Sequence, residues 1–360
     1  MWGTALACLG AFVGAAGAAP SATLTTVVSG LDNPRDLAFG PNGKLYVAEA
    51  GSGGPDCVAG TCAGFTSGIS LVNVTSGTAR RIVSGLASTS DPGGFGAIGV
   101  DGISFLGNGT LYGILGEASD AVPSGLPAGV TAGLEAELGR LVKANPSGDW
   151  KVVSDVGHAD FLWSEDHQFL VPPGQFPDAN PYAVLAGGGV EWVVDAATNT
   201  IDRVDRNGSI ASRTFIPNPP LSDAVPTCID KGPDGALYIG ELTGVPNGAG
   251  AASIWRFNPA TGDLSQWATG LTAVTGCGFG VDGNFYAVEF STTGGFFTAG
   301  PGDGAVVRVP AHSTSPTVVA SGLSFPGGFA AGADGSLYVS NWSTAPASTG
   351  LGSVLRITLG

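Results

Sequence analysis

A hairpin pattern of apolar and polar positions recurs along the chain. Its first copy, residues 33–49, reads as an apolar strand, a tight turn that contains glycine, and a second apolar strand. One aromatic residue marks the second strand of each copy: Tyr46, Tyr112, Trp192, Tyr238, Tyr286 and Tyr338. The last four lie 46 to 52 residues apart, a spacing typical of four-stranded propeller blades. One hairpin cannot bury both of its faces but a closed ring can, so the pattern predicts an all-β, six-bladed β-propeller.

The two ends of the chain are predicted to share the last blade. Residues 24–29 read as a lone β-branched strand, and residues 353–358 read as a third strand without an outer partner. The N-terminal strand is therefore expected to complete the last blade and remove an exposed sheet edge. Residues 20–360 then form one domain, with blades over 33–81, 100–154, 180–215, 226–268, 274–320 and 325–358. Helix is expected only as one or two turns at 132–138.

The lengths of the connections differ between the two faces of the predicted disc. Turns between first and second strands are short and rich in Asn-Gly and Asp-Gly, which tolerate positive φ. The long segments follow second or fourth strands, and they span 50–67, 87–99, 116–138, 157–179, 242–250, 291–303 and 342–350. Both kinds of connection leave from the same end of a blade. The face that carries them is therefore the predicted binding face.

The first 19 residues are apolar and small and contain no Asp, Glu, Lys or Arg. We interpret residues 1–19 as a signal peptide, so the mature chain is expected to be secreted, extracellular or periplasmic. The segment is too short and too rich in glycine for a transmembrane anchor. The net charge of −15, with 14 Lys and Arg, argues against nucleic-acid partners and against adsorption to anionic lipid.

Four cysteines lie beyond that segment. Cys57 and Cys62 share one glycine-rich stretch, where a disulfide would close a small loop in an oxidising compartment; a zinc site is the alternative. Cys228 and Cys277 fall on the inner strands of neighbouring blades. Because such cysteines usually act as small buried hydrophobes, free thiols are predicted there.

One repeat position carries the candidate chemistry. Three residues beyond each aromatic stand Glu49, Leu115, Asp195, Glu241, Glu289 and Asn341. These strand ends should converge on the mouth of the central channel, where four carboxylates would repel one another. Oxygen ligands without His or Cys favour Ca²⁺, so the five polar residues are candidate metal ligands. The alternative is that they are solvated or hydrogen-bonded structural side chains.

Two further groups of polar residues stand near this mouth. The residues that begin the inner strands could form a second layer around it, and they are Arg35, Asp36, Asp101, Thr227 and Thr275. Residues 158–178 contain two histidines and several carboxylates, a composition that could suggest a metal site or an acid–base pair. Their spacing matches no metal motif, and the aromatic residues among them predict a self-packed loop with a polar rim.

Several phrases in the chain resemble the ScyD/ScyE family of secreted propellers, named for their association with biosynthesis of the pigment scytonemin. Three of the similar segments are the secretory leader, the two-cysteine loop of the first blade and NPY at the start of blade three. The others are the stretches VVSGLDNPRDLAFGPNGKLYVAEAG, VPTCIDKGPDGALYIGELTG, and GADGSLYVSN with GSVLRI near the end. The resemblance covers nearly the whole mature chain. Its repeated motifs are less specific, because NHL-repeat and gluconolactonase-like propellers share them. It implies a six-bladed propeller outside the cytoplasm and brings no catalytic motif. The chain departs from the family pattern at 158–178.

Three functions follow as hypotheses. The first is a secreted, monomeric binding propeller whose long-loop face takes a small molecule, a glycan or a protein, with Ca²⁺ as a candidate cofactor. The second is a metal-dependent lactone or ester hydrolase, in which the cation would polarise a carbonyl and activate water. Leu115 interrupts any complete ring of ligands for such an ion. The third is a structural extracellular scaffold.

Overall fold

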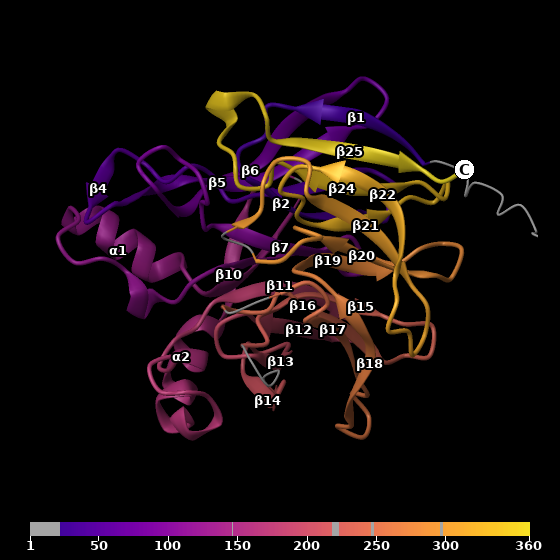
Figure 1. Ribbon diagram of the computed structural model, residues 1–360. Helices are drawn as coiled ribbons and strands as arrows, with labels where there is room; N and C mark the ends of the chain where they lie inside the picture. The colour runs from indigo at the N-terminus through magenta and orange to yellow at the C-terminus, as the bar shows by residue number, and fades with distance from the viewer. Residues whose placement is uncertain (1–21, 146, 218–222, 246–247, 296–297) are drawn as a thin grey trace, which may run out of the picture.

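The computed structural model describes residues 22–145, 147–217, 223–245, 248–295 and 298–360. The segment interpreted as a signal peptide lies outside these residues. Among the described residues, no helix is long and apolar enough to cross a membrane. The chain folds into six antiparallel sheets around one axis, which confirms the six-bladed β-propeller (Figure 1).

Each blade places its strands from the axis outward. The inner strands are β2 (Pro34–Phe39), β7 (Val100–Phe105), β11 (Pro181–Gly187), β15 (Pro226–Lys231), β19 (Val274–Phe279) and β23 (Phe329–Ala331). The second strands are β3 (Leu45–Glu49), β8 (Leu111–Leu115), β12 (Val190–Asp195), β16 (Leu237–Glu241), β20 (Phe285–Glu289) and β24 (Leu337–Asn341). The third strands are β5 (Thr61–Asn73), β9 (Arg140–Ala144), β13 (Thr200–Asp205), β17 (Ala252–Phe257), β21 (Gly304–Val309) and β25 (Ser353–Thr358). The outer strands are β6 (Thr78–Ser90), β10 (Trp150–Asp155), β14 (Ile210–Phe215), β18 (Leu264–Leu271), β22 (Thr317–Leu323) and β1 (Thr23–Ser29).

The N-terminal strand forms the outer strand of the last blade. β1 pairs antiparallel with β25, from Thr23 opposite Thr358 to Ser29 opposite Ser353. Figure 1 shows the two strands side by side near the C-terminus. The first and last segments of the propeller therefore share one sheet, and β25 is not left as an open edge.

The repeated aromatic of each blade is buried between blades. Tyr238 lies edge-on against Phe279 of the next inner strand, with ring centroids 5.0 Å apart, and Tyr46 does the same with Phe105 at 4.7 Å. Tyr338 closes the ring against Phe39 of the first blade at 5.2 Å. Edge-to-face pairs add stabilisation beyond the area that they bury. One aromatic per repeat therefore fixes each blade against its neighbour.

The longest connections lie at one end of the blades, which we call the long-loop face; the opposite end is the turn face. The long-loop face carries the helices α1 (Ala128–Glu137) and α2 (Val156–Asp166), and the 3₁₀ turns η1 (Ser119–Ala121), η2 (Gln168–Leu170) and η4 (Ala347–Thr349). Helix α1 is longer than predicted. Helix α2 was not predicted, because residues 158–178 were expected to form a loop. Figure 1 shows both helices outside the ring of strands.

Blade one is larger than the pattern indicated. The region 50–67, expected to be a loop, contains β4 (Asp56–Val58) and the first residues of β5, so that this sheet has five strands. Cys57 lies directly opposite Cys62 across β4 and β5, and the predicted disulfide between them is present. The disulfide holds this added hairpin closed.

Candidate functional site

The six inner strands enclose a cavity of about 260 Å³ on the propeller axis. All five residues of the predicted second layer line it: Arg35, Asp36, Asp101, Thr227 and Thr275. Tyr182 and Asp230 add further polar groups, and Phe279 and Phe329 contribute apolar walls. A concave site with apolar walls and a few convergent polar groups is typical of small-molecule binding sites.

Arg35 and Asp101 form a buried ion pair in this wall. Arg35 Nε lies 3.3 Å from Asp101 Oδ1, and the two side chains are 9% and 2% exposed. Neither of these two atoms has a hydrogen-bond partner within the described structure. The other end of the guanidinium donates to the carbonyl oxygen of Ala97, in the long segment that leads to blade two. A donor and an acceptor therefore lie side by side with hydrogen-bonding capacity to spare.

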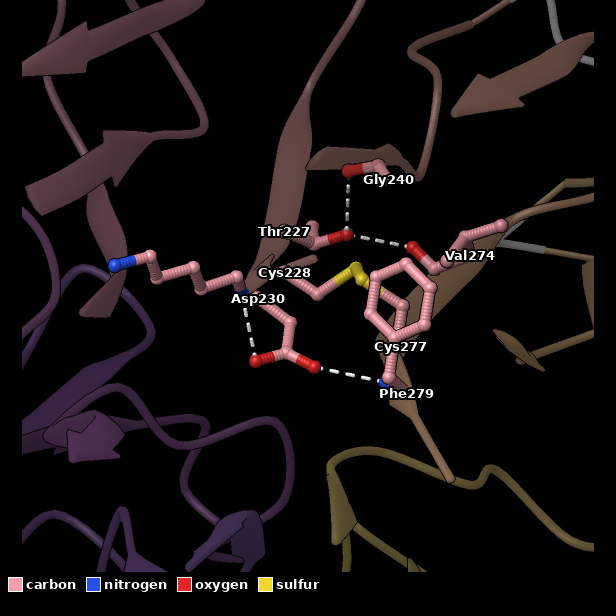
Figure 2. Close-up of a disulfide and its surroundings, with 8 residues drawn as sticks. Thr227, Cys228, Asp230, Gly240, Val274, Cys277 and Phe279 are labelled. Carbon is pink, nitrogen blue, oxygen red and sulfur yellow. Dashed lines mark hydrogen bonds between the residues drawn. A yellow bond between two sulfur atoms is a disulfide. The ribbon is translucent and has the colours of Figure 1, made fainter. Parts of the chain in front are cut away.

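Two more carboxyl groups in the cavity connect adjacent inner strands. Asp36 accepts the backbone N–H of Ile103 at 3.0 Å, and Asp230 accepts the backbone N–H of Phe279 at 2.8 Å. Figure 2 shows the latter bond from β15 to β19. Burial raises the pKa of both carboxyl groups, that of Asp36 to about 7. Burial also raises the pKa of Asp101 to about 7, although the Arg35 charge opposes this shift.

The threonine hydroxyls of the cavity also join blades. Thr227 Oγ1 donates to the carbonyl oxygen of Val274 at 2.6 Å, as Figure 2 shows. Thr275, one blade further on, donates in the same way to the carbonyl oxygen of Pro326 at 3.0 Å. Each hydroxyl still has acceptor capacity. The wall of the cavity is therefore held in place by bonds between neighbouring inner strands.

The prediction of free thiols at Cys228 and Cys277 is wrong, because the two residues form a disulfide in the cavity wall (Figure 2). Their Cα atoms are 5.7 Å apart, within the range that a disulfide spans. The sequence holds a signal for this pair. Their separation of 49 residues is close to the blade repeat, which puts them at neighbouring positions on adjacent inner strands.

The structure does not bring the five predicted metal ligands together. Glu49, Asp195, Glu241, Glu289 and Asn341 end their second strands, but none of them lines the central cavity. Each accepts hydrogen bonds from backbone N–H groups of its own blade: those of Asp32, Asn180, Ser253, Thr272 and Ser324, respectively. Among the described residues, no group of three or more His, Cys, Asp or Glu is placed to hold one metal ion. The residues present therefore do not fit the predicted calcium site.

Three of these acids have further interactions or shifted pKa values. Glu49 is also paired with Arg81, at 2.7 Å between Oε2 and a guanidinium nitrogen. Glu241 accepts the indole N–H of Trp255. Burial raises the pKa of Glu241 and of Glu289 to about 7, and their hydrogen bonds from N–H groups oppose the shift. The geometry matches that of hydrogen-bonded structural side chains.

The segment 158–178 packs on blade three, and its two histidines have separate partners. His158 Nδ1 lies 2.9 Å from Asp120 Oδ2, whereas the ring of His167 stacks on Trp163 with centroids 4.2 Å apart. Asp160 of α2 is fully buried and pairs with Arg213 of β14. The pairing of Asp160 with Arg213 was not expected from the sequence, because the two residues are far apart in the chain.

The similarity of this chain to known proteins was found by comparison of structures, not of sequences. No protein-family model matches it, and no curated protein sequence matches it. A gluconolactonase from Xanthomonas campestris superposes with a TM-score of 0.55 at 10% identity, over 97% of this chain and 94% of that one. A Thermus thermophilus protein described as an oxidoreductase (glucose dehydrogenase) gives 0.55 at 18% identity, over 94% and 100%. The PQQ-bound aldose sugar dehydrogenase of Streptomyces coelicolor gives 0.53 at 14% identity, over 95% and 99%.

These identities establish similarity of fold alone. The structural relatives are six-bladed propellers of the gluconolactonase-like and NHL-like kind. The ScyD/ScyE resemblance rests on sequence phrases and stays a prediction. What the comparisons add to the geometry is that the chain has the six-bladed propeller fold over nearly its whole length.

Proposed function

We propose that this chain is an exported binding protein, of the ScyD/ScyE type, whose central cavity takes up a small hydroxylated molecule. The observation that carries the proposal is the buried Arg35–Asp101 ion pair in the cavity wall: Nε and Oδ1 lie 3.3 Å apart, and neither atom makes a hydrogen bond within the described structure. A hydroxyl group both accepts and donates, so one ligand hydroxyl can satisfy both atoms. A buried polar atom that makes no hydrogen bond is costly, and a bound hydroxyl would reduce that cost.

The size and charge of the cavity support the same ligand class. Its volume of about 260 Å³ is slightly below the usual range of roughly 300–1,000 Å³ for ligand pockets, which favours a small ligand. Both Asp101 and Asp36 have a pKa of about 7, so both carboxyl groups are partly protonated at neutral pH, and Asp101 offsets the Arg35 charge in part. A neutral ligand with several hydroxyl groups suits this wall better than a strongly charged ligand.

Export is part of the proposal. Two disulfides, one of them in the wall of the proposed site, are typical of proteins that fold in an oxidising compartment. The apolar first 19 residues support the same location.

A hydrolase of the lactonase type is the second candidate function. Asp36 and Asp101 have pKa values of about 7 in one cavity, which suits general acid–base catalysis at neutral pH. A carboxylate would take a proton from water as the water oxygen attacks the lactone carbonyl. Arg35 would donate to the developing oxyanion. The ring C–O bond would then break, and the leaving oxygen would take up the proton to give a hydroxy acid. No step passes through a metal ion.

The test is a thermal-shift screen with D-glucose, D-mannitol and gluconolactone, followed by calorimetric titration. A ligand at a hundredfold excess over its Kd should stabilise the native protein by about 2.7 kcal/mol. We expect Arg35→Gln/Asp101→Asn, and the more conservative Asp101→Asn alone, to weaken that binding at least tenfold. Ring opening of gluconolactone, followed by NMR, separates the hydrolase from the binding protein.

The matched control is the half-exposed pair Arg256 and Asp234 of blade four, whose charged atoms are 2.7 Å apart. Arg256→Gln/Asp234→Asn removes the same two charges away from the cavity and should leave binding unchanged. Equal binding by both double variants would place the ligand elsewhere. No response to any compound of the screen would contradict the proposal and favour the structural scaffold.

A further inference from the structure

Two lysines lie directly opposite each other on blade two. Lys143 of β9 and Lys151 of β10 are in-register partners on adjacent antiparallel strands, so their side chains share one face of the sheet. Like charges in this arrangement are unfavourable. The chain contains only four lysines and has a net charge of −15, so two lysines at one point are a local exception to its acidity.

No carboxylate among the described residues forms an ion pair with either lysine. The ion pairs of the described residues all involve arginine or histidine and none involves lysine. The nearest acid in sequence, Asp149, is held within its own turn: its Oδ2 accepts from Asn145 Nδ2 at 3.2 Å and from Ser147 Oγ at 3.0 Å. These bonds lower the pKa of Asp149, which therefore stays ionised but is oriented toward the turn. The lysine charges are left for an external anion.

A surface pocket of about 390 Å³ lies beside the lysines, on the turn face of blade two. Its lining combines Lys143 and Lys151 with the exposed carboxylate of Asp149, the half-buried indole of Trp150 and the exposed amides of Asn108 and Asn145. It shares no lining residue with the central cavity. The pocket therefore offers two cations against one carboxylate that is bonded within its own turn, together with one apolar ring and several neutral hydrogen-bonding groups.

We propose that this pocket binds a carboxylated sugar unit, a hexuronate within an acidic saccharide. A carboxylate placed between the two ammonium groups forms charge-assisted hydrogen bonds with both and removes their mutual repulsion. The indole provides an apolar surface for the C–H face of the sugar ring. The amides can both donate to and accept from its hydroxyls. The inference does not depend on the proposed function of the central cavity.

The test is calorimetric titration of the full mature chain with galacturonic acid trimers and, in parallel, with neutral galactose trimers. The proposal predicts binding of the galacturonate trimer, at least tenfold weaker or absent binding of the galactose trimer, and weaker binding at higher salt. Lys143→Gln/Lys151→Gln should reduce galacturonate affinity at least tenfold. Its melting temperature should stay close to the parent value, because Lys151 is exposed, Lys143 is half-buried and neither forms an ion pair with another described residue.

The remaining two lysines provide the matched control. Lys44 and Lys231 are exposed near the same face, and Lys44→Gln/Lys231→Gln changes the net charge by the same amount. This variant should bind the galacturonate trimer within twofold of the parent. If both double variants lose galacturonate affinity equally, the effect comes from the overall charge of the protein, and the proposal is overturned. No binding of the trimer, or equally tight binding of inorganic phosphate, would also overturn it.

Discussion

Four side chains at one repeat position accept a hydrogen bond from the backbone segment that leads into the inner strand of their own blade. The four are Glu49, Asp195, Glu289 and Asn341, and the bonds measure 2.7 to 2.9 Å. Buried backbone N–H groups need a hydrogen-bond acceptor. The segments that lead into the inner strands are not part of a sheet, so no neighbouring strand supplies one. The repeated polar residue therefore has a structural role that explains its recurrence without a shared ligand.

The first prediction separates this role from metal binding. Glu289→Ala should cost about 1–3 kcal/mol of unfolding free energy, because it leaves the N–H of Thr272 without its acceptor. Glu289→Gln keeps an acceptor oxygen in place and should cost much less. Denaturant unfolding of the two variants measures the difference.

The same variants test calcium. We expect the melting temperature in chelator and in millimolar Ca²⁺ to be the same for the parent protein and for Glu289→Gln. If Ca²⁺ raises the melting temperature of the parent protein but not that of Glu289→Gln, this carboxylate is a calcium ligand, which would contradict the structural role.

At the residue scale, the sequence predicts which positions are equivalent but not where their side chains point. The periodic spacing located both the strand ends and the cavity-lining residues that begin the inner strands. Whether Glu241 turns toward the axis or toward Trp255 depends on backbone donors that appear only after folding. The disulfide between Cys228 and Cys277 was not predicted, because buried cysteines usually act as small hydrophobes, although the 49-residue separation is close to the blade repeat.

Helix α2 is attached to blade three through a buried charged cluster. Arg213 bonds both Asp160 of α2 and Asp202 of β13, and all three side chains are largely shielded from water. Burial raises the pKa of Asp160 well above its usual range, and the nearby Asp202 and Asp195 add to the shift. Asp160 Oδ2 has no hydrogen-bond partner within the described structure. Ionisation of Asp160 is therefore less favourable in the native cluster than in the unfolded chain.

The second prediction is that attachment of α2 weakens as pH rises. A carboxyl group whose pKa is raised in the native state stabilises that state at low pH relative to high pH, because the unfolded segment ionises from about pH 4 upward. The contribution is lost progressively as pH rises from about 4 through the native pKa. Protection factors of the α2 amides, corrected for intrinsic exchange, should fall as the pH is raised through this window. Asp160→Asn cannot ionise and should abolish this fall.

The control for this prediction is Asp166→Asn, an exposed position on the same helix. It should retain the pH dependence of the parent. If Asp160→Asn and the parent lose protection in parallel, the titration of another group controls α2.

At the element scale, the strands follow from apolar alternation and the turns from their glycines; Gly43, for example, has a φ of 71°. Helix α2 escaped prediction because its buried face is not apolar. Of the positions that it buries, only Val156 is a large apolar residue; Gly157, Asp160 and Ser164 are small or polar, so the sequence shows no hydrophobic stripe. Its start is fixed by Asp155, which accepts the backbone N–H of His158 at 3.2 Å.

On the scale of the whole molecule, bonds between neighbouring inner strands make the propeller a closed ring around its cavity. Thr227 reaches the carbonyl oxygen of Val274, and the backbone N–H of Gly328 donates to the carbonyl oxygen of Arg35, which joins the last blade to the first. β1 closes the same junction from outside. This closure follows from six repeats of the hairpin pattern, and for that reason the fold could be predicted from sequence. The composition of the cavity could be predicted only in part, because it depends on six strands that are far apart in the chain.

The central claim is that Arg35 and Asp101 hold a ligand hydroxyl in the axial cavity. A crystal structure of the protein soaked in the tightest binder of the thermal-shift screen tests it most directly. The account predicts ligand density inside the cavity, with one hydroxyl within hydrogen-bond distance of both Arg35 Nε and Asp101 Oδ1. Ligand density on the long-loop face or at the blade-two pocket, with the cavity filled by water alone, would contradict it.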